Sequence, residues 1–394
     1  MKYQAQDPAN TYEDLQFSSI KDAQPSADHA DLGGQYNPQA ESGEIIVKIT
    51  LDQLINLCVD KEASDIHFRE GGRVGLRVGR KIIFIEDIKS LSKAETEAMI
   101  NAMIPSEEEK KRLEHDREID FSYTHTNGIS FRVNAFYQKG KLAGVMRMIT
   151  KHIPTLEQLG VPAALTNFLN IRQGLVLVCG GAGSGKSTTI QAMLQYINEN
   201  FVKHILTIEN PIEYVFEDKK SIFTQREVGK DTLTESNALK SAFREDADVV
   251  MVSGIIDYET LDKVLDLVET GHLVIASMLT RDATQTVERM IDFYPHDMRW
   301  QALRRVADNM TAVLVQNLVD RRDGQGRVAI FELMLMNQSI HEIISRGNYV
   351  QLRSAIQSSA SEGMITMDSY AYELADQGIV NQESIAEYLH PEEQ

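Results

Sequence analysis

Apolar and polar positions change their spacing several times along the chain, and the first changes predict a small α+β domain. Apolar residues recur at helical spacing from Leu51 to Val59, and Thr50 precedes them as a candidate N-cap. The small α+β domain is predicted to end near Thr150. Between the first helix and this end, the pattern predicts strands at 74–78 and 81–85, helices at 93–103 and 107–115, and a strand pair at 119–123 and 130–137.

From Leu156 onward, short and wholly apolar runs alternate with helical patterns. Such βα alternation is typical of a mostly parallel sheet covered by helices on both faces, so we predict an α/β fold for this part. Several short helices follow, from Ser339 to about Leu389. The predicted strands lie at 175–178, 203–208, 249–252, 273–277 and 329–333.

Changes in composition suggest where the regions meet. The segment before residue 45 is polar and has too few apolar groups to offset the entropy of ordering, so we expect a disordered tail. Ile153-Pro154-Thr155 is predicted to be an extended linker, because proline excludes helix at the residue before it. The predicted organisation is a tail at 1–44, an N-terminal domain at 45–150, an α/β domain at 151–345 and a C-terminal helical subdomain at 346–394.

One stretch, GGAGSGKSTT at 180–189, follows the apolar run LVLV and fits the G-x-x-x-x-G-K-[ST] pattern of a phosphate-binding loop. Glycines let backbone N–H groups converge on phosphates, and the ammonium of Lys186 can reach the β and γ phosphates. The hydroxyl of Ser187 can ligate Mg²⁺, and a helix opening near Thr188 adds the positive end of its dipole. We therefore predict that the chain binds ATP or GTP. The predicted nucleotide-binding residues are Gly180, Gly183, Ser184, Gly185, Lys186, Ser187 and Thr188.

Composition narrows the remaining possibilities. The chain has 394 residues, enough for two domains, and its formal net charge of −18 argues against a nucleic-acid partner, which needs a basic footprint. Its two cysteines, Cys58 and Cys179, lie in apolar patterns and are expected to be buried thiols in a reducing compartment. No stretch approaches the ~18 apolar residues of a membrane span. We expect a cytoplasmic protein that touches the membrane only through partners.

Further motifs follow one another in an order and spacing that are together highly specific, although each alone is weak. Over about 46–377, the chain resembles the PilT/PilU pilus-retraction ATPases of the type II/IV secretion ATPase superfamily. Besides the phosphate loop, the motifs are ASDIH at 63–67, FRVNAF at 131–136, IPTLEQLG at 153–160, TIENPIE at 207–213, QREVG at 225–229, RED at 244–246, ETGHLV at 269–274 and GMITMD at 363–368.

The resemblance implies a RecA-like P-loop motor domain joined to a smaller PAS-like N-terminal domain. It further implies a hexameric ring that binds Mg-ATP and acts on an inner-membrane platform protein of the pilus. Arg132 and Arg147 match the family arginines that approach the γ-phosphate, where a guanidinium can grip two oxygens. For each, a surface ion pair is the alternative. His272 matches the first histidine of the family's histidine box, and for it a buried core role is the alternative.

Where the family carries a glutamate that positions the attacking water, this chain has Gly254, which has no side chain. General-base assistance is typically worth ~10²–10⁴ in rate. Glu209 is the nearest remaining carboxylate candidate. The other departures from the family pattern are Ile256 for an arginine, Asn210 for an aspartate, Leu279 for the second histidine and His341 for an arginine.

Three hypotheses follow from these departures. We favour a subunit that binds Mg-nucleotide but hydrolyses it weakly or not at all, either docked on an active retraction ATPase or forming a ring that responds to binding alone. The second is an active retraction motor that uses Glu209 or a relocated carboxylate such as Asp257 or Glu213. The third is a nucleotide-binding ring of another secretion system.

Overall fold

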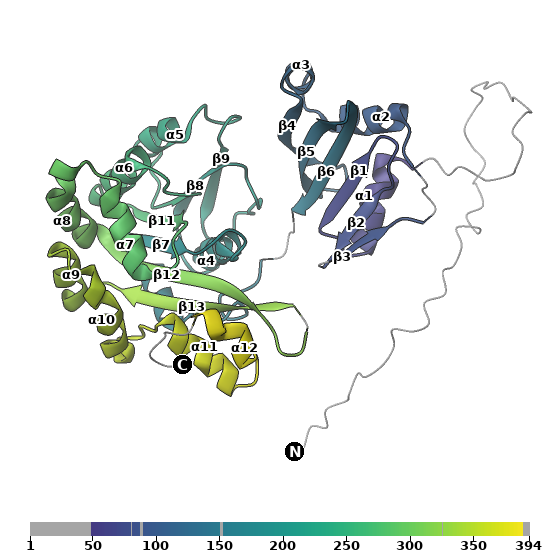
Figure 1. Cartoon of the computed structure of the whole chain (residues 1–394). Helices are drawn as coiled ribbons and strands as arrows, with labels where there is room; N and C mark the ends of the chain where they lie inside the picture. Colours follow the sequence, from purple (N-terminus) through teal and green to yellow (C-terminus); the bar gives the residue numbers. More distant parts are fainter. Residues whose placement is uncertain (1–48, 80, 87–89, 150–152, 325, 389–394) are drawn as a thin grey trace, which may run out of the picture. The chain divides into compact units, whose positions relative to one another are not determined.

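The computed structural model describes residues 49–388, except 80, 87–89, 150–152 and 325. The predicted tail at 1–44 lies outside these residues. Two sheets organise the described residues, one at 65–149 and the other at 174–335 (Figure 1).

The first sheet has six strands in the order β3-β2-β1-β6-β5-β4, and every neighbouring pair is antiparallel. The three helices of this region bury their apolar residues in the same core as the strands. This is the α+β domain that the apolar pattern predicted. Its elements are α1 (Leu51–Asp60), β1 (Asp65–Arg69), β2 (Gly75–Val78), β3 (Lys81–Phe84), α2 (Lys93–Met103), α3 (Glu107–Asp116), β4 (Glu118–Thr124), β5 (Ser130–Gln138) and β6 (Lys141–Ile149).

Local hydrogen bonds explain why the helices here begin where the sequence predicts. The Thr50 hydroxyl accepts from the N–H of Gln53, and the Gln53 side chain accepts from the N–H of Thr50, which forms a capping box. Ser92 and Glu95 make the same reciprocal pair at the start of α2. The sequence prediction missed β1 and β6, which lie side by side in the middle of this sheet.

The second sheet has seven strands in the order β13-β12-β7-β11-β10-β8-β9, all parallel except β13, which pairs antiparallel with β12. The mostly parallel sheet is therefore confirmed, while β9 and β12 were missed. Its strands and the helices around them are β7 (Gly174–Cys179), α4 (Lys186–Asn200), β8 (His204–Glu209), β9 (Ile222–Glu227), α5 (Glu235–Ala242), β10 (Val249–Val252), α6 (Tyr258–Glu269), β11 (Leu273–Met278), α7 (Ala283–Asp292), α8 (Arg299–Asn309), β12 (Met310–Asp320) and β13 (Arg327–Leu335).

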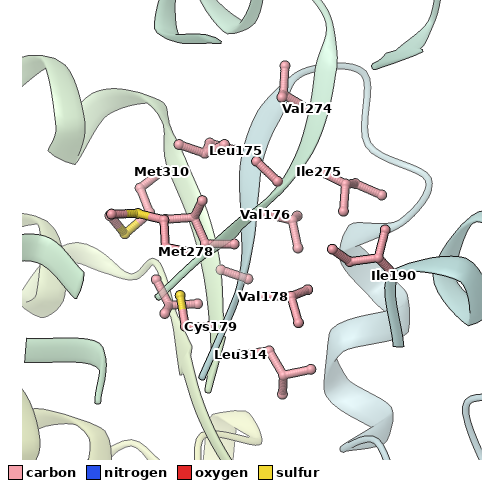
Figure 2. Packing of buried hydrophobic residues seen from close by; sticks show 14 of the residues in the cluster. Leu175, Val176, Val178, Cys179, Ile190, Val274, Ile275, Met278, Met310 and Leu314 are labelled. Atoms are coloured by element: carbon pink, nitrogen blue, oxygen red, sulfur yellow. The ribbon is translucent and has the colours of Figure 1, made fainter. Parts of the chain in front are cut away.

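Strand β7 lies at the centre of the hydrophobic core of this sheet. Every side chain from Leu175 to Cys179 is fully buried. Figure 2 shows Val176 and Val178 on the side of Ile190 of α4, whereas Leu175 and Cys179 lie on the other side of the strand. Because β7 is held from both faces, the loop that follows it has a fixed starting point.

The C-terminal helices belong to the same hydrophobic core as the seven-stranded sheet. Leu352 and Ile356 of α10 are buried there, and the backbones of Leu333 and Ile365 exchange two hydrogen bonds that attach this region to β13. The helices are α9 (Gln338–Ser345), α10 (Leu352–Ser358), α11 (Met367–Asp376) and α12 (Gln382–Ile385). Among all helices that the structure describes, none combines the length and hydrophobicity needed to cross a bilayer.

His125 links the hairpin between β4 and β5 to the first helix. Its side chain is 6% exposed, and its Nε2 lies 3.0 Å from Asp52 Oδ1 of α1. The hydrogen bond to Asp52 raises the pKa of His125 above its usual value. Because the folded-state pKa exceeds that of the unfolded chain, this pair stabilises the fold fully below about pH 6.5 and loses its effect as the pH rises through the folded-state pKa.

We expect Asp52→Asn to lower the free energy of unfolding by about 0.5–1 kcal/mol more at about pH 5.5 than at about pH 8.5, since only the protonated imidazole gains from the carboxylate. Urea unfolding at both pH values measures the difference. Asp60→Asn, at the other end of α1, is the control and should show no such pH dependence. Equal destabilisation by Asp52→Asn at both pH values would contradict the assignment.

Candidate nucleotide-binding site

The loop at 180–185 joins the carboxyl end of β7 to the start of α4 and requires glycine at several positions. Gly180, Gly183 and Gly185 have φ angles of +145°, +73° and +91°, in the region that side chains disfavour. A Cβ on Gly180 would also lie 2.3 Å from the carbonyl oxygen of Gln316, and one on Gly185 would lie 2.7 Å from its Nε2. The glycine pattern therefore follows from both backbone conformation and close packing.

The first residues of α4 carry the groups expected to meet phosphate. Lys186 Nζ donates to the carbonyl oxygens of Gly180 (3.0 Å) and Gly181 (2.7 Å), so the ammonium lies over the loop. Burial lowers the pKa of Lys186, and the charges of Cys179 and Glu213 act in the opposite direction. Ser187 is exposed and Thr188 half-buried in the first turn.

Ser184 provides a direct test of whether the loop fits a phosphate group. Its side chain is buried, yet its Oγ has no hydrogen-bond partner within the part of the chain that the structure describes. A buried hydroxyl without a partner is costly, and a phosphate oxygen would satisfy it. Together with the exposed N–H groups at the start of α4, this makes the loop a fitting cradle for a nucleotide phosphate.

Glu209 ends β8 at the same edge of the sheet, three strands from β7. It is 3% exposed, and it accepts hydrogen bonds from Thr207 Oγ1 (2.7 Å), Gln225 Nε2 (3.2 Å) and the N–H of Glu213 (3.3 Å). Burial raises the pKa of Glu209 in spite of these bonds. Both carboxylate oxygens are thus engaged with the protein.

Asp257 and Glu213, the two other carboxylates that could replace the missing glutamate, have different surroundings. Asp257 caps α6, because its Oδ1 accepts from the N–H of Thr260 at 2.8 Å. Glu213 lies in the loop after β8, is exposed, and is close enough for its charge to raise the pKa of Lys186. Of these two carboxylates, Glu213 is therefore the one whose charge acts on the phosphate-loop lysine.

Space for a side chain remains at Gly254, which follows β10. A Cβ there would lie 3.6 Å from Ser277 Oγ and 3.9 Å from Ile256, which are ordinary contact distances. The neighbouring Ser253 hydroxyl donates to the carbonyl of Ile208 at 3.1 Å. A Cβ at position 254 is therefore compatible with the surrounding structure.

Two further departures from the family pattern leave apolar side chains exposed, because Ile256 and Leu279 are 67% and 56% exposed. Asn210 directly follows Glu209 and is also exposed. His341 lies on α9, where its Nε2 is 2.7 Å from Asp308 Oδ1.

The structure does not bring His272 together with the phosphate loop within one chain. His272 precedes β11, and its carbonyl accepts from the N–H of Gly174, the first residue of β7. The six residues of β7 separate this edge from the loop by about 20 Å, given a rise of about 3.3 Å per residue. The Nδ1 of His272 lies 2.9 Å from the carbonyl oxygen of Leu267, so the half-buried imidazole contacts its own domain instead of the phosphate loop.

Arg132 and Arg147 are direct neighbours on β5 and β6 of the first sheet. Arg147 Nε donates to Asp65 Oδ1 at 2.8 Å, and Asp65 is 3% exposed. Burial opposes ionisation of Asp65, but hydrogen bonds from Ser64 and Arg147 hold its pKa below the usual value. Arg147 therefore makes an ion pair within its own domain.

A cavity of about 640 Å³ opens beside Gly181 and Ala182 of the loop and contains a residue that the sequence analysis missed. Glu332 of β13 is 5% exposed and accepts from the N–H of Ala283 at 2.7 Å. Burial raises the pKa of Glu332 to about 7. Gln316 of β12, which contacts the loop directly, was missed as well. The available signal was a polar residue directly after an apolar run, Glu332 after Phe331 and Gln316 after Val315.

Comparisons with known proteins agree with this geometry. The family model described as Type II/IV secretion system protein matches residues 39–386. The type IV pilus retraction ATPase PilT of Pseudomonas aeruginosa is 36% identical over 337 residues, which cover 86% of this chain and 97% of that protein. The type IV pilus ATPase PilU of the same organism is 34% identical, with 84% and 86% covered.

Among solved structures, the pilus retraction motor PilT with bound ADP superposes with a TM-score of 0.82 at 35% identity, covering 88% of this chain and 99% of that one. The chain thus belongs to the type II/IV secretion system protein family. Within this family its similarity to PilT and PilU places it in the PilT/PilU group. The resemblance drawn from its motifs is confirmed, and so is its fold class, an α/β RecA-like core with an N-terminal domain.

We expect Gly185→Ala to abolish measurable nucleotide binding, because the new methyl group meets Gln316 Nε2 and the backbone must leave its positive φ. Calorimetric titration with MgADP measures the affinity, and thermal unfolding measures stability. The control is Gly271→Ala, which has a φ of +103° but open space around it. It should lower stability by about 1 kcal/mol while leaving the affinity unchanged. Normal affinity in Gly185→Ala would contradict the packing argument.

Proposed function

We propose that this chain is a motor subunit of the type IV pilus retraction machinery that binds Mg-ATP and hydrolyses it weakly or not at all. The observation that carries the proposal is a complete phosphate loop in a chain that has Gly254, without a side chain, where the family has a glutamate. The loop, with Lys186 and an unsatisfied Ser184 hydroxyl, supports binding. The absence of a carboxylate at position 254 supports slow turnover, since general-base assistance is typically worth ~10²–10⁴ in rate.

In this proposal the nucleotide-binding residues act mainly by position and charge. The backbone N–H groups of the loop after Gly180 and those at the start of α4 hold the β and γ phosphates, and Lys186 neutralises their charge. The Ser187 hydroxyl ligates Mg²⁺, which supplies charge stabilisation when it is bound. Arg132 and Arg147 are proposed to act on the nucleotide of an assembled particle, where Arg147 would have to leave Asp65.

We further propose a homo-oligomer, a hexamer, on the cytoplasmic side of the inner membrane. In this proposal, which follows the family resemblance, the oligomer works alone or docks on an active retraction ATPase. The pilus platform protein of the inner membrane is the proposed contact with the membrane. In such an assembly the regions at 45–150 and 151–345 act as separate N-terminal and motor domains, with 346–394 as a C-terminal helical subdomain.

A second candidate function, an active retraction motor, is favoured by one observation. The charge of Glu213 acts on Lys186, the residue proposed to neutralise the phosphates, and the Glu213 side chain is exposed. Glu213 could hold the attacking water and accept its proton as the oxygen attacks the γ-phosphorus and ADP leaves. Glu209 is less suited because its oxygens are already hydrogen-bonded.

Restoring the missing acid tests the proposed function. We expect the purified chain to bind MgATP, to release phosphate slowly, and to gain at least about tenfold in turnover when Gly254 is replaced by glutamate. Gly254→Gln is the matched control, since it fills the same space without a base. Vigorous turnover by the unmodified chain that Lys186→Ala abolishes would refute the proposal, as would failure to bind MgATP.

Replacing Glu213 by glutamine separates the two candidate functions. If the chain is an active motor that uses Glu213, the phosphate release rate should fall about 10²-fold while MgADP affinity changes little. Glu217→Gln removes a charge from the same loop and should have no such effect. An unchanged rate in Glu213→Gln removes the support for an active motor based on this residue.

A further inference from the structure

We propose that Gln316 is a positioning residue that holds the phosphate loop in its binding conformation. This inference rests on the proposed nucleotide binding by the loop. Gln316 lies far along the chain from the loop, on β12, the strand next to β7. Its side chain is 2% exposed, and the four residues before it in the strand, 312–315, are apolar and buried.

Both polar atoms of the Gln316 side chain form hydrogen bonds, one with the loop and one with α4. Nε2 donates to the carbonyl of Ser184 at 2.7 Å, and Oε1 accepts from Thr189 Oγ1 at 2.7 Å. A backbone carbonyl can only accept, so the amide orientation follows from the contact with Ser184. Thr189 is itself 1% exposed, so neither hydrogen bond is open to water.

Gln316 also limits the loop sterically at its two ends. A Cβ on Gly180 would lie only 2.3 Å from the carbonyl oxygen of Gln316, and a Cβ on Gly185 would lie only 2.7 Å from its Nε2. One residue therefore contacts the beginning of the loop, its last turn and the first turns of α4. A loop that is fixed at these points presents its N–H groups without further ordering when phosphate arrives.

Loss of these contacts should weaken nucleotide binding in addition to stability. The carbonyl of Ser184 and the hydroxyl of Thr189 would be left buried without partners, and the loop would relax into other conformations. The apparent affinity then falls in proportion to the fraction of molecules that keep the binding conformation. We expect Gln316→Met, which keeps the volume but not the hydrogen bonds, to weaken MgADP binding about tenfold.

A buried amide elsewhere in the same domain provides the matched control. Asn198 of α4 is fully buried, donates to the carbonyl of Glu217 at 2.9 Å and accepts from the N–H of Lys219 at 3.0 Å. Asn198→Leu removes the same number of side-chain hydrogen bonds at the other end of α4. It should lower the melting temperature as Gln316→Met does, but leave the MgADP dissociation constant unchanged.

The hydroxyl of Thr189 tests the same contact from its other side. Thr189→Val should weaken MgADP binding, whereas Thr189→Ser keeps the hydroxyl and should restore it. The double variant Gln316→Met with Thr189→Val should lose less affinity than the two single losses combined, because the residues share one hydrogen bond.

Calorimetric titration of the full chain with MgADP, with thermal unfolding of each variant, distinguishes the outcomes. If the unmodified chain does not bind MgADP, the proposed function fails and this inference fails with it. If the unmodified chain binds and Gln316→Met binds equally well, only the positioning role is overturned. If Gln316→Met does not fold, Thr189→Val decides the question, and an affinity equal to that of Thr189→Ser would overturn the proposal.

Discussion

Burial of β7 on both faces of the seven-stranded sheet is the constraint on which the candidate site depends. The strand enters the core at Gly174 and leaves it at Cys179, and α4 returns along it with Ile190 packed against its valines (Figure 2). Burial of several large apolar side chains, each worth about 1.5–3 kcal/mol, fixes both ends of the phosphate loop. Only the short glycine-rich segment between them can adapt, and Gln316 of β12 packs against that segment.

The same sheet is consistent with the proposed separation of binding and turnover. The groups proposed to bind phosphate, the backbone N–H groups and Lys186, belong to the β7 loop and α4. The positions proposed to affect turnover lie at the ends of other strands, Gly254 after β10 and Leu279 after β11. Because preorganised polar groups supply much of the transition-state stabilisation, changes at these strand ends could lower turnover in the proposed function while the loop keeps its structure.

Elements with a strong local signal could be predicted from the sequence. Helices α1 and α2 begin where the sequence predicted, α1 after the candidate cap Thr50 and α2 at residue 93, and both starts carry capping boxes between residues only three positions apart. The missed strands have weaker local signals. Strand β9 is a half-exposed edge strand without an apolar run, and β12 follows α8 directly, with no turn residues between them. Strand β12 also pairs with β7, which lies far from it in the sequence, so local spacing contains little information about that pairing.

The sequence by itself determined the phosphate loop, the family and the absence of an acid at Gly254, since each depends on residue types at fixed short spacing. Only the tertiary structure decided which distant residues meet at the loop. It placed Gln316 and Glu332 beside the loop, left His272 at the opposite edge, and paired Arg147 with Asp65. These outcomes depend on strand order and register, which arise from packing between segments far apart in the sequence, such as Asp65 with Arg147 and Ser184 with Gln316, and no local pattern encodes that packing.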